Sequence, residues 1–404
     1  MRPGAQGVSP RQQAGVTGGV PLPNLAEPVG PKKGTKLPMP SKKIDDLIRP
    51  DVWEIKEYIP IEPPEVLGKA HGMAPERIIK LDGNENPYGP SPRVAEALAR
   101  CQSFPFYPDP GQQELRRLIQ GYIGIDARFI FGGSGSDEII DLILRATISP
   151  GDKIIDCPPT FGMYRFSTEV CGGGVVDVPR DDRYQIDLER VLEVIDDRTK
   201  IIFLASPNNP TGTLMPLEIV PELLKTGLLV VLDEAYYEFS GKTMIHEALQ
   251  HENLIVLRTF SKWAGLAGLR VGYGVMQESI SRHLWKIKPP YNVNVAALEA
   301  VQATLSDIPY LRTNIEKIKA ERERMYSALE DLDFLKPFPS EANFVFCRLT
   351  RGRGLAVRDA LRERGIFVRY FDTPLTKNAI RISVGRTEDT DAVMRALQDI
   401  GKEL

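Results

Sequence analysis

The sequence predicts an α/β fold, in which a mostly parallel central sheet carries helices on both faces and a smaller α+β domain follows. One observation is a series of short, nearly unbroken apolar runs, typical of strands buried on both faces. A second is the helical or turn segment between successive runs, which parallel strands need as a connection. The runs lie at 128–131, 153–157, 175–178, 200–205, 228–233, 254–258 and 271–275.

The smaller domain is predicted from the pattern near the C-terminus. A long, charged, amphipathic stretch over 310–331 leads away from the sheet. Strands then alternate with helices, so we expect a separate α+β layer. The strands are predicted at 343–348, 366–371 and 379–384, and the helices at 353–364 and 387–403. Near the other end, Ser91 and Pro92 are expected to begin a helix as capping hydroxyl and first-turn proline.

Residues 1–44 differ in composition and are predicted to form a flexible leader. They are rich in Gly and Pro, and their basic residues outnumber the single acid, Glu27. Such a segment cannot bury enough apolar surface to order itself. It lacks the apolar core of a secretory signal. A plastid or mitochondrial leader and a plain disordered tail or cloning remnant both remain open.

Charge and composition exclude several classes of function. The net charge of -3 over 404 residues indicates neither nucleic acid nor an anionic membrane as a partner. No run of about 18 apolar residues occurs, so no membrane span is expected. The four cysteines form no CxxC pair, which favours reduced thiols. The four histidines are scattered and do not indicate a metal site.

Candidate binding residues follow the strands, because ligands in open α/β sheets bind beyond the carboxyl ends of the strands. The run at 128–131 leads into GGSGSDEII, a glycine turn in which Ser136 is the expected helix N-cap. Backbone N–H groups at such a turn can hold a phosphate. The side chains of Asp137 and Glu138 would repel it, so a cation from elsewhere is needed. A capped helix without a ligand is the plainer alternative.

The next two strand ends carry groups suited to a flat ring. Phe161, in PPTFGMY, could stack on a ring or pack in the core. The strand at 200–205 ends in SPNNPTG, where two prolines and a glycine fix a turn with Asn208 and Asn209 at its tip. So dense a run of turn-forming residues after a buried strand is a more specific signal than the composition of an ordinary loop.

Asp233 ends the apolar run LLVVLD at the same edge of the sheet. A buried carboxylate without a partner is costly, so Asp233 should meet a cation. Tyr236 follows three residues later and points to the same side if the chain turns helical.

The strand LIVLR leads into TFSKWAGLAGLR, which combines hydroxyls with two cations. Ser261 and Arg270 suit a phosphate. Lys262 in a dry cleft would have a lowered pKa and a nucleophilic amine. With Asp233 and Phe161, these residues require an aldehyde, a flat ring, a cationic ring nitrogen and a phosphate. Pyridoxal 5'-phosphate (PLP) has all four, and its protonated ring is an electron sink.

From about residue 45 onward the sequence resembles the fold-type I PLP-dependent aminotransferases. Within them it looks most like the histidinol-phosphate aminotransferases of the plant and algal type. The segments that carry the resemblance are LDGNENPYGP, FYPDP, GSDEIIDL, DCPPTFGMY, SPNNPTG, VVLDEAYYEFSG, ENLIVLRTFSKWAGLAGLRVGYG, PYNVNVAA and IRISVG. It implies a segment over 45–95 that covers the site and packs with the small domain. A large PLP-binding domain over 96–308 and a small C-terminal domain over 309–404 follow.

The resemblance implies a role for each residue around the cofactor ring. Lys262 is the Schiff-base lysine and the acid–base group. Asp233 pairs with the pyridine nitrogen, while Tyr236 and Asn209 hydrogen-bond the phenolate oxygen. Phe161 stacks on the ring where relatives have tyrosine, which keeps the stacking face and loses a hydroxyl.

The resemblance also implies residues for the cofactor phosphate. Ser136 and Asp137 hold it through their backbone, and Ser261 and Arg270 hold it through their side chains. Ser136 replaces an alanine of the relatives, which leaves a backbone role intact. Tyr107 of FYPDP reaches the phosphate of the other subunit, so a homodimer with shared sites is expected.

Substrate contacts are implied for two arginines and two asparagines. Arg381 matches the arginine that binds the substrate carboxylate, and Arg369 matches a second anion-binding arginine. Asn84 and Asn86 lie in the covering segment. The implied substrates are L-histidinol phosphate and glutamate or 2-oxoglutarate, whose phosphate and carboxylates the arginines could pair with in turn. The amino group then passes to and from the cofactor in two half-reactions.

The residues leave other functions open. An aromatic or aspartate-type aminotransferase, or a PLP-dependent decarboxylase of a phosphorylated amino acid, would also bind small anions through arginines. A PLP-binding regulator is the alternative of another class, but the leader is too short and flexible to be a DNA-binding module.

Overall fold

The computed structural model describes residues 43–371, 373–376 and 378–404. The chain divides into two units, Met1–Arg49 and Pro50–Leu404. The described part of the first unit holds one 3-10 helix, η1 (Ile44–Leu47). Apart from its last two residues, the predicted leader lies outside the described residues. The second unit contains two sheets, which confirms the α/β prediction.

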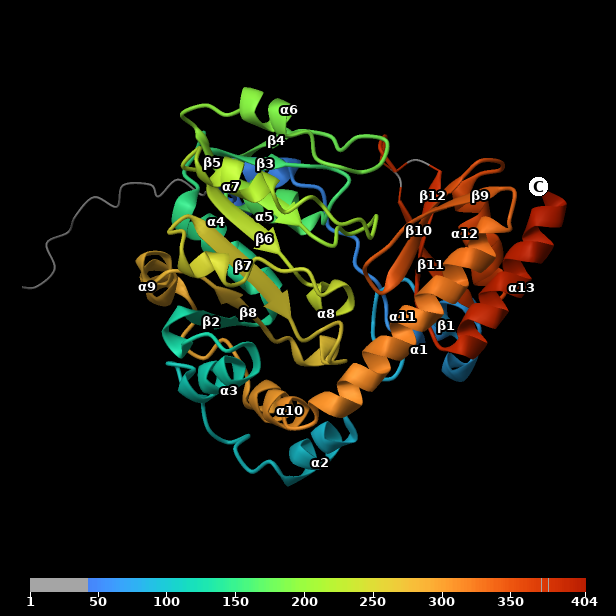
Figure 1. Cartoon of the computed structure of the whole chain (residues 1–404), viewed down its shortest axis with the longest axis horizontal. Coiled ribbons are helices and arrows are strands. Elements are labelled where there is room, and N and C mark those ends of the chain that lie inside the picture. Colours follow the sequence, from blue (N-terminus) through green and yellow to red (C-terminus); the bar gives the residue numbers. More distant parts are fainter. Residues whose placement is uncertain (1–42, 372, 377) are drawn as a thin grey trace, which may run out of the picture. The chain divides into compact units, whose positions relative to one another are not determined.

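The larger sheet has seven strands in the order β2-β8-β7-β6-β5-β3-β4 (Figure 1). Its strands are β2 (Ile130–Gly133), β3 (Lys153–Asp156), β4 (Gly174–Asp177), β5 (Thr199–Ala205), β6 (Leu229–Asp233), β7 (Leu254–Thr259) and β8 (Gly272–Val275). Neighbouring strands from β4 to β7 are parallel, whereas β8 runs antiparallel to β7 and β2. The sheet is therefore mostly parallel, as predicted.

Alternate residues of the central strands enter two different cores. On β5, Ile201 and Phe203 belong to one core, and Ile202 and Leu204 belong to the other. Because side chains alternate across a strand, this sheet is buried on both faces, which is why its strands read as unbroken apolar runs.

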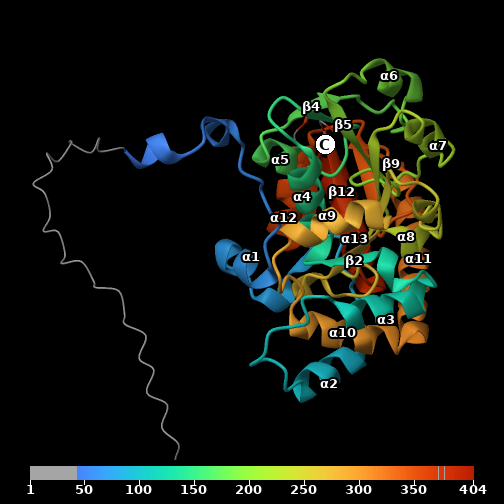
Figure 2. The same cartoon turned by 90° about the vertical axis from the view of Figure 1, so that its left-hand side faces the viewer.

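Helices cover both faces of this sheet (Figures 1 and 2). Helices α4, α5 and α9 contribute to the core that contains Ile201, and α3, α7 and α10 contribute to the other. Helices over this part of the chain are α2 (Pro92–Arg100), α3 (Gln113–Ile123), α4 (Gly135–Thr147), α5 (Met163–Val170), α6 (Leu188–Glu193), α7 (Ile219–Leu224), α8 (Tyr237–Ser240), α9 (Glu278–Ile287) and α10 (Val295–Leu305). Ser91 caps α2 as predicted, since its side chain accepts a hydrogen bond from Arg93 N–H.

The smaller sheet has five strands in the order β1-β11-β12-β10-β9. They are β1 (Ile79–Leu81), β9 (Leu335–Phe338), β10 (Phe344–Leu349), β11 (Ile366–Phe371) and β12 (Ala379–Ser383). The long helix α11 (Ile308–Glu330) runs from beside α10 to this sheet, which also packs with α12 (Gly354–Glu363) and α13 (Thr387–Glu403) (Figure 1). Helix α1 (Pro64–His71) precedes β1. The predicted domain boundaries at 95 and 308 stay predictions.

Several elements were not predicted from the sequence, and one predicted strand begins later than expected. Strands β1 and β9 were not predicted, because they have only three and four residues and each carries a lysine. The strand expected at 128–131 begins later, since 127–129 form a 3-10 helix. Further 3-10 helices lie at Pro50–Glu54, Pro75–Arg77, Glu247–Leu249 and Ala267–Leu269. Within the described part of the chain, no helix is both long and apolar enough to cross a membrane.

Candidate active site

The predicted site residues converge at the carboxyl ends of β6 and β7. Asp233 is the last residue of β6, and it lies beside Leu257 of the parallel strand β7. Strand β7 ends at Thr259, three residues before Lys262. Because parallel neighbours end at the same edge of a sheet, the aspartate and the lysine are brought together from different parts of the chain.

Lys262 points its amine at the segment between β1 and α2. Its Nζ donates a hydrogen bond to the carbonyl oxygen of Gly83 at 3.1 Å. Desolvation, followed by the positive charge of Arg381, lowers the pKa of Lys262 to about 8. A substantial fraction of this amine is therefore neutral near physiological pH, which a nucleophilic lysine requires.

Asp233 is buried and is held by two donors. The Tyr164 hydroxyl donates to Oδ2 at 2.7 Å, and the Ala235 N–H donates to Oδ1 at 2.9 Å. Burial raises the pKa of Asp233 to about 6, although both hydrogen bonds act to lower it. The carboxylate is thus ionised above about pH 6 and suited to a cationic partner such as a protonated ring nitrogen.

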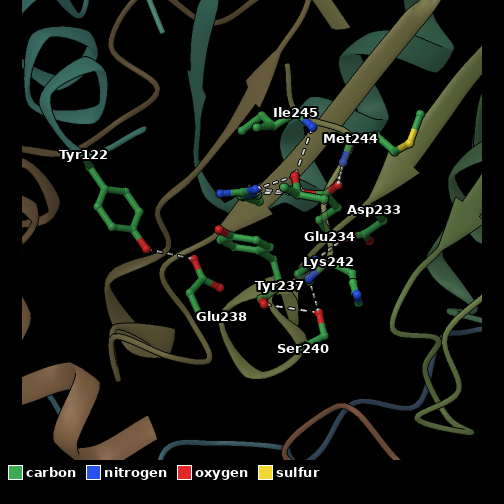
Figure 3. A network of polar contacts seen from close by, with 12 residues as sticks. Tyr122, Asp233, Glu234, Tyr237, Glu238, Ser240, Lys242, Met244 and Ile245 are labelled. Carbon is green, nitrogen blue, oxygen red and sulfur yellow. Dashed lines mark hydrogen bonds and ion pairs between the residues drawn. The ribbon is translucent and has the colours of Figure 1, made fainter. Parts of the chain in front are cut away.

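Glu234, which follows Asp233 in the chain and is labelled in Figure 3, belongs to a buried ion pair. Arg258 Nη2 is 2.9 Å from Glu234 Oε2, and both side chains are almost fully buried. Glu234 also accepts from Met244 N–H at 2.7 Å, and the Arg258 guanidinium lies 3.5 Å from the centroid of the Tyr237 ring. These contacts satisfy both charges and fix the residue that follows Asp233 in the chain.

The start of α4 forms a backbone cradle beside Arg270. The expected N-cap at Ser136 is wrong, because Ser134 is the N-cap and Ser136 is the second residue of the helix. The glycine before it, Gly135, has a φ of 76°, and a Cβ there would lie 2.5 Å from Arg270 Nη2. The Asp137 side chain pairs with the same Arg270 Nη2 at 2.7 Å. The N–H groups of Ser136 and Asp137 therefore stay at the positive end of the helix, next to a guanidinium.

Ser261 directly precedes the lysine and is held by Thr259. Its hydroxyl accepts a hydrogen bond from Thr259 Oγ1 at 2.9 Å, and its N–H donates to the same Thr259 oxygen at 3.1 Å. Because a hydroxyl that accepts still has its own proton to donate, Ser261 can serve a phosphate oxygen.

The other predicted ring-binding residues contact residues of several elements of the site. Phe161 is partly buried and meets the Tyr164 ring edge-to-face, with centroids 5.5 Å apart. Asn209 Oδ1 accepts from Arg381 Nη1 at 2.5 Å. Tyr236 is buried, and its hydroxyl accepts a hydrogen bond from Asn84 Nδ2 at 2.9 Å.

The predicted substrate residues Arg381, Arg369 and Asn86 each donate a hydrogen bond to a backbone carbonyl oxygen of the chain. Arg381 is buried, and its Nη2 donates to the carbonyl oxygen of Asp82 at 2.6 Å. Arg369 is half-buried and donates to the carbonyl oxygen of Ile59 at 3.0 Å. Asn86 Nδ2 donates to the carbonyl oxygen of Trp263 at 2.8 Å.

Tyr107 is set apart from this cluster within its own chain. Its side chain is 80% exposed, and its ring stacks on Tyr291 with centroids 4.4 Å apart. Phe104 and Phe106 are also exposed, so an aromatic surface surrounds Tyr107.

Sequence reasoning missed two residues that hold the site together. Tyr164 follows Phe161 by three residues, and its N–H donates to the carbonyl oxygen of Phe161 in the turn that leads into α5. Ser383 follows Arg381 by two residues, which puts both side chains on one face of β12. Helical and strand spacing were the available signals for these residues.

Most of the chain matches one family of known proteins. The family model described as aminotransferase class I and II matches residues 76–397. The chain is 48% identical to the histidinol-phosphate aminotransferase of Roseiflexus castenholzii, over 88% of this chain and 99% of that protein. It is 46% identical to the chloroplastic histidinol-phosphate aminotransferase of Nicotiana tabacum, over 88% and 86% of the two chains.

Solved structures agree with the sequence comparisons. A crystal structure of histidinol-phosphate aminotransferase from Sinorhizobium meliloti in complex with pyridoxal-5'-phosphate has a TM-score of 0.81 and 28% identity to this chain. The similarity covers 88% of this chain and 98% of that one. The predicted fold class and family resemblance are therefore confirmed. The chain belongs to the class I and II aminotransferases.

Proposed function

We propose that this chain is a PLP-dependent aminotransferase that interconverts L-histidinol phosphate plus 2-oxoglutarate and imidazole acetol phosphate plus L-glutamate in histidine biosynthesis. The observation that carries the proposal is Lys262, an amine with a pKa of about 8 at the same sheet edge as the buried Asp233. The relatives with 46–48% identity support the choice of substrate.

The residues of the site fit PLP. A buried carboxylate at Asp233 suits the pyridine nitrogen, and the cradle at Gly135 with Arg270 suits the phosphate. Phe161 and Tyr236 offer a ring face and a hydroxyl. When bound, the cofactor supplies an aldehyde for the lysine and a ring that withdraws electrons from the reacting carbon.

Lys262 would then have two tasks. Its Nζ would bond to the cofactor aldehyde and, once the substrate amine replaces it, would take the proton from the substrate α-carbon. The lowered pKa of Lys262 favours both tasks, because each starts from the neutral amine.

Arg381 and Arg369 would bind the anionic ends of the substrates. The fixed fork of a guanidinium pairs with carboxylates and phosphates alike, so one pair of arginines can serve histidinol phosphate and glutamate in turn. Arg381 is buried and pre-positioned by Asp82 and Asn209. Arg369 is half-buried and donates to the backbone carbonyl oxygen of Ile59, a contact that it could exchange for a ligand.

A half-reaction scan tests this function. PLP-loaded protein is mixed with one amine at a time, and loss of the visible cofactor band reports amino transfer. We expect histidinol phosphate and glutamate to discharge the band faster than phenylalanine, aspartate or threonine phosphate. A preference for phenylalanine or aspartate would move the assignment to another aminotransferase, and release of CO₂ from threonine phosphate would identify a decarboxylase.

The covalent role of Lys262 has its own test. We expect borohydride to fix PLP on the wild-type peptide that contains Lys262 and to fix none on Lys262→Ala. Mass spectrometry of the digest locates the label. Retained amino transfer in Lys262→Ala would remove the lysine from the mechanism.

We also propose a homodimer in which Tyr107 completes the partner's phosphate site. The exposed ring of Tyr107 and the aromatic residues around it support this, since such surfaces mark contacts between chains. Mixing the inactive variants Tyr107→Ala and Lys262→Ala should restore activity by forming one intact site per hybrid dimer. No recovery, or a monomer in sedimentation, would argue against shared sites.

A plastid location is proposed for the protein, with the cytoplasm as the alternative. Its support is the chloroplastic tobacco relative and the basic, acid-poor composition of residues 1–44. N-terminal sequencing of the protein from its own cells tests this, because import removes a transit peptide.

A further inference from the structure

Asn84 is buried and has a left-handed backbone, with a φ of 53°. Its N–H donates to Ser383 Oγ at 2.9 Å, and its carbonyl oxygen accepts from Asn343 Nδ2 at 2.9 Å. Its side-chain Oδ1 accepts from Ser383 Oγ and its Nδ2 donates to the Tyr236 hydroxyl, both at 2.9 Å. We infer that Asn84 is a positioning residue that aims the Tyr236 hydroxyl proton at the cofactor's ring oxygen, and that it does not itself bind the substrate.

The direction of the Asn84 amide follows from the hydrogen bonds of Ser383. A serine hydroxyl has one proton and can also accept. Because Ser383 Oγ accepts from Asn84 N–H, its proton is available for Asn84 Oδ1. The oxygen of the amide therefore faces Ser383, and the NH₂ group is left facing Tyr236.

The direction of the Tyr236 proton follows in turn. Its hydroxyl oxygen accepts from Asn84, so its own proton must point elsewhere. Among the residues that the structure describes, no acceptor takes that proton. Burial raises the pKa of Tyr236 to about 12, so the hydroxyl remains a donor at neutral pH. Phe344 packs edge-to-face on the ring at 5.3 Å and holds its plane.

The acceptor left for this proton is the phenolic oxygen of the cofactor ring, so the inference rests on the proposed function. A donor at that oxygen stabilises its ionised form and lowers the pH at which the bound cofactor titrates. Ser383 and Arg381 are two residues apart on β12. The strand that carries the proposed substrate arginine thereby also fixes a hydrogen bond to the cofactor.

The test is a pH titration of the visible absorption band of PLP-loaded protein. Asn84→Gly keeps the left-handed backbone and both backbone hydrogen bonds while deleting the amide. We expect the midpoint of this titration to rise by roughly half to one pH unit. Tyr236→Phe, which removes the hydroxyl itself, should shift the midpoint in the same direction. In a Tyr236→Phe background, Asn84→Gly should add no further shift. The charges around Lys262 and Tyr236 are the same in both backgrounds, namely Glu85, Asp137, Asp233, Arg270 and Arg381.

Two further variants make the result decisive. Asn378→Gly is the matched control, because Asn378 also has a left-handed backbone (φ 66°) but contacts Gly354 and not Tyr236. It should leave the midpoint unchanged. If Asn84→Gly fails to fold, Ser383→Ala deletes the hydroxyl that orients the Asn84 amide without adding a charge, and it should also raise the midpoint.

Other outcomes overturn the inference. An equal shift of Asn84→Gly with and without the Tyr236 hydroxyl would show that Asn84 does not act through it. An unchanged midpoint with a raised KM for substrate would make Asn84 a substrate contact. A wild-type protein with no visible cofactor band would overturn the proposed function itself, and the inference with it.

Discussion

Lys262 and Gly83 are 179 positions apart in the sequence, and the amine of the first donates to the carbonyl oxygen of the second at 3.1 Å. Gly265 allows the loop after Lys262 to pack closely on the same segment, because a Cβ there would lie 2.5 Å from the backbone of Gly89. Only glycine allows this approach, which explains the glycine at position 265. The segment before α2 is therefore a wall of the site.

The lowered pKa of Lys262 predicts how cofactor capture depends on pH. The neutral amine is the nucleophile, so the rate of PLP capture by the apo-protein should rise with pH through a midpoint near 8. Stopped-flow absorbance at fixed PLP concentration measures this rate. A midpoint near the ordinary lysine value of 10.5 would contradict the effect of desolvation and Arg381 on this amine.

Arg381→Ala should weaken substrate binding more than cofactor binding. Loss of a charge-assisted, two-point hydrogen bond should raise the KM for glutamate about 10- to 100-fold. The visible cofactor band should remain, although Arg381 also contacts Asn209. Arg395→Ala, at an exposed arginine on α13, is the control and should leave KM unchanged. An unaltered KM in Arg381→Ala would place the anion site elsewhere.

The buried pair Glu234–Arg258 should be costly to break from one side. Glu234→Gln leaves an uncompensated guanidinium and should lower the free energy of unfolding by about 3 kcal/mol, whereas adding Arg258→Met should recover part of the loss. Urea unfolding of the apo-protein measures both. The exposed pair Asp399–Lys402 is the matched control, and Asp399→Asn should cost less than about 1 kcal/mol. Equal losses at both sites would contradict the role of burial.

Asp156 should make the fold less stable as pH rises. Burial, followed by the charge of Asp177, raises the pKa of Asp156 to about 7 from an ordinary value of 3.8. Between these pH values the unfolded chain releases the proton and the folded chain keeps it, so stability falls across that window and stays low above it. Asp156→Asn should therefore stabilise the protein above pH 7 by up to roughly 4 kcal/mol.

Thermal or urea unfolding of the wild-type protein and of Asp156→Asn, each at acid and at alkaline pH, checks this. The advantage of the variant should shrink as pH falls toward 4, where the wild-type carboxyl is protonated in both states. A difference independent of pH would mean that the substitution acts through packing and not through the charge.

Local pattern was enough to predict the central strands and to single out two residues of the proposed site. Strands β5, β6 and β7 were predicted because a strand buried on both faces must be apolar throughout, and this is visible in the sequence. Asp233 and Lys262 were found because each breaks such a pattern where a strand ends. Spacing alone misled at Ser136, since Ser134 and Ser136 both suit a cap and the backbone conformation decides between them.

The sequence by itself determined the fold class, the carboxyl ends of β5 and β6 and the residue types that suit PLP. Tertiary structure alone decided which distant groups meet: Tyr164 with Asp233, Asn84 with Tyr236 and Ser383, and Arg381 with Asn209. The physical reason is that apolar periodicity reports burial along one element. Hydrogen bonds between elements depend instead on strand order, register and the one geometry that satisfies every buried polar group.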